Sequence, residues 1–317
     1  MLTQTNYNII NIDSLSYSGN LQNTQDFASN SHYKFINGNI CDKSLINQII
    51  NEYKIDAIVN FAAETHVDRS LLSPSEFIQS NIVGVEVLLE SVIDNKISRF
   101  IQISTDEVYG SSNSNESFKE DSKLNPSSPY SASKASADLL IQSFIKSYTA
   151  PAIILRPTNN FGEYQYIEKF IPLSIMSIMN EKPIPIYGTG ANLRDWLYVE
   201  DNCKAILLIL ESGELGEIYN ISANNEKSNL EVADIILKHF GKGREMLKFV
   251  KDRPAHDFRY SIDSSKIRQN IGWAPVYSFE EAISHTISWY KNNRLWINNI
   301  MNDKNFLEYY KTQYRSV

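Results

Sequence analysis

The chain has 317 residues, 42% of them hydrophobic, which is enough to bury the core of one large domain or two joined domains. Its formal net charge of −7 argues against a nucleic-acid-binding surface, so we expect a small molecule or a second copy of the chain as partner. No apolar run reaches membrane-spanning length, and we expect a cytoplasmic protein that does not contact the membrane. Cys41 and Cys203 lie far apart without histidine neighbours at ligand spacing, so neither a disulfide framework nor a metal site is expected.

Short β-branched apolar runs alternate with segments of helical periodicity in the first half of the chain. The apolar runs predict strands at 8–12, 57–61, 100–104 and 152–155. The intervening segments predict helices at 44–53, 74–95 and 131–148. Continuous apolar strands separated by helices are typical of a parallel sheet that is covered on both faces. We therefore predict an α/β fold with a doubly wound, Rossmann-like sheet.

The pattern becomes less regular after residue 157, where prolines and glycines divide the sequence into short segments. Such short segments indicate a smaller, mixed α/β substrate-binding lobe. A helix is expected from Tyr198 to Leu210, and it could return the chain to the main domain. The predicted nucleotide-binding domain comprises 1–157 with about 196–222, and the predicted lobe comprises 158–195 and 223–317. From Trp289 onward we expect a terminal helix and an extension.

Asp13 directly follows the first predicted strand, where nucleotide-binding folds place a carboxylate on the adenosine ribose. Such a carboxylate disfavours a 2'-phosphate, so NAD is expected rather than NADP. The glycine-rich phosphate loop normally lies about 20 residues before this acid, yet the first 12 residues contain no glycine. We therefore expect the first strand and the phosphate loop to be missing, either because the start codon is placed too late or because the chain is a remnant that binds NAD weakly or not at all.

Tyr130 and Lys134 lie four residues apart on a predicted helix and therefore share a face. A free tyrosine has a pKa of about 10, but a nearby ammonium and a nicotinamide charge can lower it. The phenolate could then take a hydroxyl proton while a hydride leaves for NAD. The alternative interpretation is a packed tyrosine beside a solvated lysine.

Asp106 and Glu107 follow the predicted strand that ends at Ser104, at the edge where open α/β sheets bind ligands. Glu107 is the candidate base for removing a carbon-bound proton next to a newly formed ketone. Asp106 is the candidate acid for protonating a departing hydroxyl. The alternative interpretation is a solvated pair of carboxylates on a surface loop.

Several segments, spread between Asn8 and Trp296, resemble the dTDP-glucose 4,6-dehydratases of the extended short-chain dehydrogenase/reductase superfamily. They are Phe61-Ala62-Ala63-Glu64-Thr65-His66-Val67-Asp68-Arg69-Ser70, Ser104-Thr105-Asp106-Glu107-Val108-Tyr109-Gly110, Pro129-Tyr130-Ser131-Ala132-Ser133-Lys134, Arg194-Asp195-Trp196-Leu197-Tyr198-Val199-Glu200-Asp201 and Asp252-Arg253-Pro254-Ala255-His256-Asp257. The resemblance implies that NAD oxidises C4 of a nucleotide-linked hexose, water leaves across C5 and C6, and the hydride returns to C6. It also implies a homodimer, formed through helices such as 74–95 and 131–148.

The resemblance also assigns site residues by position. The catalytic ones would be Thr105, Asp106, Glu107, Tyr130 and Lys134. The NAD contacts would be Asp13, Ser14, Leu15, Ser16, Asn39, Ile40, Phe61, Ala62, Ala63, Ser80, Tyr130, Lys134 and Asn160, with Asn39 standing where the family usually has Asp. The substrate contacts would be Thr65, Thr105, Asn159, Lys169, Phe170, Pro185, Ile186, Tyr187, Arg194, Asn220, Arg253 and His256. Arg194 and Arg253 suit a diphosphate because guanidinium groups pair with phosphate oxygens.

Two other functions remain open from the sequence. A sugar-nucleotide 4-epimerase also uses a Tyr-x-x-x-Lys pair and NAD but needs no base at C5, so the Asp106-Glu107 pair argues against it. A non-catalytic remnant could bind sugar nucleotides or pair with an intact paralogue. The missing phosphate loop favours the remnant, whereas the presence of all five catalytic residues argues against it.

Overall fold

The computed structural model describes residues 1–113, 116–252, 254, 256–302 and 306–307. These residues form two compact units. Unit 1 comprises Met1–Pro157, Lys204–Ile221 and Ile262–Trp273, and unit 2 comprises Thr158–Cys203, Ser222–Ser261 and Ala274–Val317. This division differs from the predicted one in two places: the second segment of unit 1 starts at Lys204 rather than near 196, and unit 1 takes a third segment from the predicted lobe.

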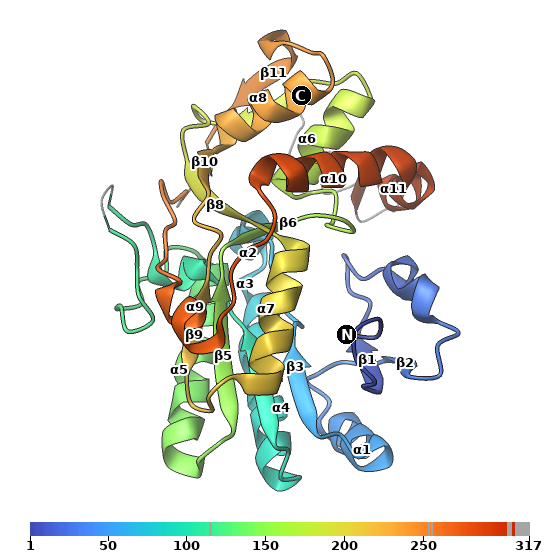
Figure 1. Ribbon diagram of the computed structural model, residues 1–317, viewed down its shortest axis with the longest axis vertical. Coiled ribbons are helices and arrows are strands. Elements are labelled where there is room, and N and C mark those ends of the chain that lie inside the picture. The colour runs from blue at the N-terminus through green and yellow to red at the C-terminus, as the bar shows by residue number, and fades with distance from the viewer. Residues whose placement is uncertain (114–115, 253, 255, 303–305, 308–317) are drawn as a thin grey trace. The chain divides into compact units, whose positions relative to one another are not determined.

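Unit 1 contains two parallel sheets (Figure 1). The first pairs β1 (Ile9–Asp13) with β2 (Tyr33–Asn37). The second has the order β3-β4-β5-β9, with β3 at Ala57–Asn60, β4 at Arg99–Ile103, β5 at Ala152–Pro157 and β9 at Ile218–Ile221. Every residue of β5 is buried, as expected for an inner strand of a sheet covered on both faces. The predicted parallel strands are confirmed, but their ladder is interrupted, because β1 pairs with β2 while β3 pairs with β4.

Helices pack on these strands and build the core of unit 1. They are η1 (Leu21–Phe27), α1 (Lys43–Tyr53), α2 (Val67–Leu72), α3 (Pro74–Ile78), η2 (Gln79–Val83), α4 (Gly84–Asp94), η3 (Asp106–Tyr109), α5 (Pro129–Tyr148) and α9 (Ser265–Ile271). The predicted helix 74–95 is thus helical from Pro74 to Asp94, with a π turn in η2 between α3 and α4. One face of the sheet packs Phe100 and Ile154 against Leu89 of α4 and Ile141 of α5.

The described residues of unit 2 combine short strands with helices. Its sheets have the orders β10-β8-β6 and β11-β7. The strands are β6 (Asn159–Phe161), β7 (Ile184–Tyr187), β8 (Leu193–Tyr198), β10 (Glu226–Ser228) and β11 (Leu247–Val250), and the helices are α6 (Phe170–Met179), α8 (Asn229–His239), α10 (Phe279–Asn292) and α11 (Arg294–Met301), with a short turn η4 (Arg244–Met246). Isoleucines at helical spacing on α6 and α10 pack around Trp196 of β8. The predicted terminal helix starts earlier than expected, because Trp289 lies inside α10.

The predicted helix that begins near Tyr198 is α7 (Val199–Ser212). Its first residues belong to unit 2 and the rest, from Lys204, to unit 1. Within the described residues, no helix is long and apolar enough to span a bilayer. Nor does this part of the chain gather three or more His, Cys, Asp or Glu side chains that could hold a metal ion.

Candidate active site

The carboxyl end of β4 carries the two adjacent carboxylates. Thr105 caps the short helix η3, and its hydroxyl accepts a hydrogen bond of 3.2 Å from the Glu107 amide. The same hydroxyl donates to Asp106 Oδ1 at 3.1 Å. Asp106 is buried and Glu107 is partly exposed. A threonine at this N-cap position therefore fixes the backbone from which both carboxylates project.

Helix α5 supplies the tyrosine and the lysine. It begins with a capping box between Ser128 and Ser131, so Tyr130 stands in its first turn. The Tyr130 ring packs edge-on against Phe77, and its phenol interacts with the Thr105 hydroxyl. One turn later, Lys134 Nζ donates a hydrogen bond of 2.6 Å to the carbonyl oxygen of Ile103 at the end of β4. The structure thus brings all five predicted catalytic residues to one strand end in unit 1.

Burial has the largest effect on the pKa values of Tyr130 and Lys134. It lowers the pKa of Lys134 to about 8, against the opposing charge of Asp138. It raises the pKa of Tyr130 well above its usual value, and the Glu107 carboxylate raises it further. The expected lowering of the tyrosine pKa is therefore not seen in the protein alone, because desolvation of the phenolate outweighs the effect of Thr105.

The predicted adenosine contacts lie at the carboxyl ends of β1 and β2. Asp13 is exposed, and its Oδ1 accepts a hydrogen bond of 2.7 Å from the Leu15 amide, which fixes the carboxylate at the strand end. Asn39 is also exposed and accepts from the Cys41 amide at 2.9 Å. Ile40 is buried, so its side chain belongs to the core and only its backbone could contact a ligand.

The strand β3 is followed by an exposed aromatic residue. Phe61 is 58% exposed, and the next amide, that of Ala62, is held by the Asn60 side chain at 3.1 Å. Ala63 follows in the same loop, and Ser80 lies in the π turn η2. A fixed, accessible carboxylate at Asp13 and an exposed apolar surface at Phe61 fit the adenosine portion of NAD. Among the predicted NAD contacts, Asn160 alone belongs to unit 2, where it lies on β6.

Unit 2 carries most of the predicted substrate contacts. Lys169 occupies the N-cap position of α6 without a side-chain capping bond, and Phe170 is the first residue of that helix. His256 Nδ1 lies 2.6 Å from Asp252 Oδ1, and its ring packs edge-on against Tyr187 of β7. Asn159 lies on β6, whereas Thr65 belongs to unit 1, where it is exposed.

Arg194 is buried beneath the loop that follows β11. Its guanidinium donates to the carbonyl oxygens of Asp257 at 2.9 Å and Phe258 at 3.3 Å, and it lies over the Tyr260 ring. These contacts orient the side chain, although they also use part of its donor capacity.

Four predicted substrate contacts need correction or fall outside the described residues. Asn220 is fully buried, and its amide donates to the carbonyl oxygens of Phe118 and Asp263 while its oxygen accepts from the Tyr109 hydroxyl at 2.9 Å. This side chain is saturated within unit 1, so it holds loops together and does not bind substrate. Ile186 is also fully buried, as is the Pro185 before it, so only the Ile186 backbone could contact a ligand. Arg253 lies outside the described residues.

The sequence motifs did not indicate two polar residues, Asn81 and Asp138, whose contacts hold the elements around the carboxyl end of β4. Asn81, in the π turn, accepts from the Glu64 amide and donates to the Glu64 carbonyl and the Ser133 hydroxyl, each at 2.9 Å. Asp138, one turn after Lys134, forms a buried ion pair with Arg156 of β5. The helical spacing of Asp138 could have indicated its place beside Lys134, whereas the partner on β5 is a tertiary contact.

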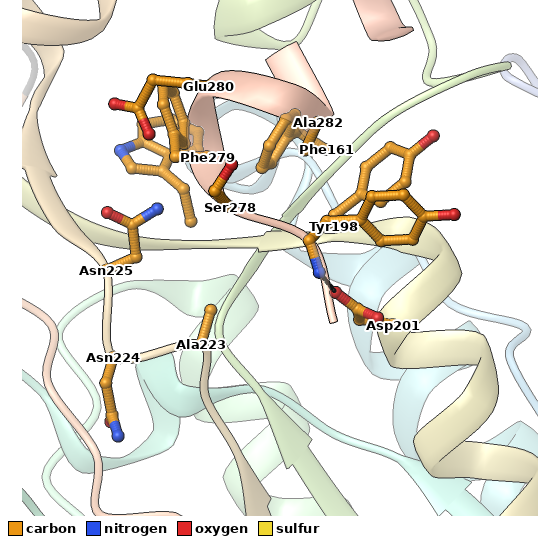
Figure 2. Close-up of a pocket in the computed structure, with 12 residues that line it drawn as sticks. Phe161, Tyr198, Asp201, Ala223, Asn224, Asn225, Ser278, Phe279, Glu280 and Ala282 are labelled. Carbon is orange, nitrogen blue, oxygen red and sulfur yellow. Dashed lines mark hydrogen bonds between the residues drawn. The ribbon is translucent and has the colours of Figure 1, made fainter. Parts of the chain in front are cut away.

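A separate cavity of about 260 Å³ lies within unit 2. Figure 2 shows that aromatic side chains such as Tyr198 and Phe279 surround it. The Asp201 carboxylate accepts a hydrogen bond of 3.1 Å from the Tyr277 amide at its edge. None of the predicted site residues lines this cavity, so it gives no support to the predicted chemistry.

A tyrosine and a lysine one helical turn apart, held at the carboxyl end of a parallel strand, define a protein of the short-chain dehydrogenase/reductase class. Residues 1–286 match the family model described as GDP-mannose 4,6 dehydratase. The chain therefore belongs to this family of sugar-nucleotide 4,6-dehydratases, as its motifs predicted.

The chain is also similar to individual dTDP-glucose 4,6-dehydratases. The chain is 45% identical over 285 residues to a dTDP-glucose 4,6-dehydratase of Streptomyces niveus, covering 90% of this chain and 84% of that protein. It is 40% identical to the Escherichia coli enzyme of the same name, covering 95% and 91% of the two chains.

Solved structures of other proteins are also similar to the structure of this chain. The dTDP-glucose 4,6-dehydratase DesIV of Streptomyces venezuelae, determined with NAD and dTDP bound, has a TM-score of 0.91 at 39% identity, covering 94% of this chain and 91% of its own. A UDP-glucuronic acid 4-epimerase of Bacillus cereus reaches 0.86 at 26% identity, covering 92% and 93%.

Proposed function

We propose that the chain is an NAD-dependent hydro-lyase that converts dTDP-glucose to the 4-keto-6-deoxy sugar nucleotide. The observation that carries this function is the pair Asp106 and Glu107, which the Thr105 cap places at the same strand end as Tyr130 and Lys134. A 4-epimerase needs only the tyrosine and the lysine. The added acid and base are the groups that elimination of water requires.

The first step is oxidation at C4 of the hexose. NAD, when bound, supplies a hydride acceptor that later returns the same hydride. The Tyr130 phenolate takes the proton of the C4 hydroxyl as the hydride leaves. Because burial raises the pKa of this phenol, the residue is neutral in the protein alone, and a cationic group bound beside it would favour the phenolate. The Lys134 ammonium supplies part of that positive charge from one turn away.

The second step removes water across C5 and C6. The C4 ketone makes the C5 proton acidic, and Glu107 accepts that proton. Asp106 donates a proton to the C6 hydroxyl, which leaves as water as the C5–C6 double bond forms. Glu107 would return its proton to C5 as the hydride came back to C6, and passage of the Tyr130 proton to Asp106 would restore both groups for the next turnover.

The nucleotide end of the substrate requires cationic and aromatic groups, and unit 2 contains them. Arg194, Lys169 and His256 offer charged or polar donors to a diphosphate, and Tyr187 and Phe170 offer aromatic surface to a nucleobase. The proposed contacts also include Asn159, Thr65, the backbone of Ile186 and Arg253, which lies outside the described residues. A sugar-nucleotide substrate and NAD suit an enzyme of the cytoplasm.

We also infer a homodimer. Large apolar side chains are exposed on the helices for which the sequence predicted an interface: Ile78 is 52%, Leu139 58% and Tyr148 61% exposed. Covering such side chains with a second copy would remove apolar surface from water. Light scattering should give twice the mass of one chain, and Leu139→Glu should return a monomer with unchanged helicity.

The experiment that tests the function is incubation of the full chain with NAD and dTDP-glucose deuterated at C4. The proposed reaction yields a 4-keto-6-deoxy product that carries the deuterium at C6, with no net formation of NADH. An epimerase would yield dTDP-galactose with all its oxygens. Binding of dTDP-glucose without conversion would instead indicate the non-catalytic remnant.

A further inference from the structure

One face of α5 presents three polar side chains at successive helical turns. Tyr130, Lys134 and Asp138 follow each other at intervals of four residues, and all three are buried. The proposed chemistry uses the first two. Asp138 is 0% exposed and cannot touch substrate, yet it occupies the turn directly beyond the lysine.

The Asp138 carboxylate is held from the neighbouring strand. Arg156 of β5 donates from Nε to Asp138 Oδ2 at 2.8 Å, and the two side chains are 1% and 0% exposed. Arg156 in turn donates from Nη1 to the Tyr109 hydroxyl at 2.6 Å and to the Glu120 carbonyl at 3.2 Å. Tyr109 ends η3, the helix that carries Asp106 and Glu107. The ion pair therefore joins α5, β5 and η3 behind the reacting groups.

The lysine, the aspartate and the arginine form one buried group of charges. Burial lowers the pKa of Lys134, and the Asp138 charge opposes this by stabilising the ammonium. Burial raises the pKa of Asp138, and Arg156 and the Ser104 hydroxyl oppose that shift. When Lys134, Asp138 and Arg156 are all ionised, the Asp138 carboxylate stabilises the charges of both buried cations.

Other ionisable groups surround α5 on the elements that pack against it. They are Tyr130, Lys146 and Tyr148 on α5 itself, Asp106, Glu107 and Tyr109 on η3, Asp68 and Arg69 on α2, Glu76 on α3, Glu86, Glu90 and Asp94 on α4, and Arg156 on β5. Of these and Asp138, it is Asp138 whose charge stabilises the Lys134 ammonium.

We propose that Asp138 is a positioning residue for the reaction, which keeps the buried Lys134 ammonium charged where it meets the end of β4, while Arg156 holds the carboxylate in place. This inference rests on the proposed function for its catalytic meaning, because a charged Lys134 matters there for stabilising the Tyr130 phenolate. The arrangement itself is independent of turnover and can be measured directly.

Two variants distinguish electrostatic stabilisation of the Lys134 ammonium from an effect of packing alone. Asp138→Asn and Arg156→Gln each break the same buried ion pair, so both should lower stability. Asp138→Asn should lower the pKa of Lys134, whereas Arg156→Gln should leave it unchanged or raise it. Asp138→Asn leaves two buried cations together, whereas Arg156→Gln leaves a carboxylate that serves the lysine alone.

The measurement is a pH titration of the Lys134 Cε signal by NMR in the full chain labelled with ¹³C-lysine, assigned by its absence in Lys134→Arg. We expect a midpoint at pH of about 8 in the unchanged protein. In Asp138→Asn the midpoint should fall by about one unit or more, a tenfold change in the protonation equilibrium, and in Arg156→Gln it should stay or rise. If Asp138→Asn fails to fold, the double variant is compared with Arg156→Gln, and a lower midpoint is expected in the double variant.

An unchanged midpoint in Asp138→Asn, or an equal fall in both single variants, would overturn the proposal. Turnover adds a second readout: the alkaline limb of kcat should move to lower pH with the lysine midpoint, while KM for dTDP-glucose stays constant. Absence of turnover in the unchanged protein would contradict the proposed function, yet the NMR titration would still decide the role of Asp138.

Discussion

The Lys134 ammonium donates a 2.6 Å hydrogen bond to the carbonyl oxygen of Ile103. This contact joins α5 to the last residue of β4, immediately before the segment that carries the two carboxylates. The lysine is only 3% exposed, so the protein buries a cation at this strand end. Burial of this kind costs stability and is expected where function requires the charge.

Replacing the buried lysine should therefore stabilise the fold. The pKa of Lys134 is about 8 in the folded protein, against 10.5 as the ordinary value. The cost of this shift is present in full below pH 8 and is relieved as the pH rises from 8 to 10.5, because the unfolded chain then holds the extra proton. Lys134→Met should raise the free energy of unfolding at pH 7 by about 1–3 kcal/mol, an advantage that shrinks toward pH 10.5.

Urea unfolding at pH 7 and pH 10 measures this effect, and Lys146→Met on the exposed side of the same helix is the control. The control should change stability by no more than about 0.5 kcal/mol at either pH. Equal stabilisation by both substitutions would point to helix propensity and would contradict the explanation by burial.

Glu107→Gln should separate oxidation from elimination. The glutamate raises the pKa of Tyr130, so its neutralisation should not impair proton transfer from the C4 hydroxyl. Without a base at C5, the 4-keto-glucose intermediate should accumulate and no 4-keto-6-deoxy product should form. NADH absorbance and mass spectrometry of the sugar nucleotide follow the two steps.

The exposed residue Glu86 on α4 provides the control for that experiment, since Glu86→Gln removes the same charge from a residue outside the proposed site. If Glu107→Gln still dehydrated the substrate at an unchanged rate, Glu107 would not be the base at C5. In Tyr130→Phe, by contrast, even NADH should not form.

Asn81 should be important for stability and for the site. Its side chain satisfies both backbone groups of Glu64 and contacts Ser133 on α5. Asn81→Ala would remove these three hydrogen bonds from a buried or partly buried setting, and each polar group that loses its hydrogen bond there costs about 1–3 kcal/mol. We expect a loss of about 2–4 kcal/mol in urea unfolding. Asn51→Ala removes an exposed asparagine that also makes two hydrogen bonds, and it should cost less than about 1 kcal/mol.

The capping box of α10 offers a test confined to unit 2. Ser278 accepts from the Glu281 amide at 3.2 Å, and Glu281 accepts in return from the Ser278 amide at 3.0 Å. Ser278→Ala should lower stability by about 1 kcal/mol. Ser288→Ala, an exposed serine in the middle of the same helix, should leave the thermal midpoint unchanged or slightly raised, because alanine is the better helix former.

The sequence by itself determined the elements and the chemistry that depends on local spacing. Apolar runs and helical periodicity predicted the parallel strands, and the spacing of Tyr130 and Lys134 placed both on one helical face, because these patterns follow from the geometry of single elements. The position of Asp106 and Glu107 at a strand end also followed from chain order. The motifs then indicated the family.

Only the tertiary structure decided what these residues meet. Arg156 and Asp138 are 18 residues apart, and their pairing depends on how β5 lies against α5. Asn220 carried a motif position yet proved to be saturated by Tyr109, Phe118 and Asp263, which come from distant segments. The pKa of Tyr130 in the protein alone also lies above its usual value, because desolvation depends on everything packed around a group and not on its neighbours in sequence.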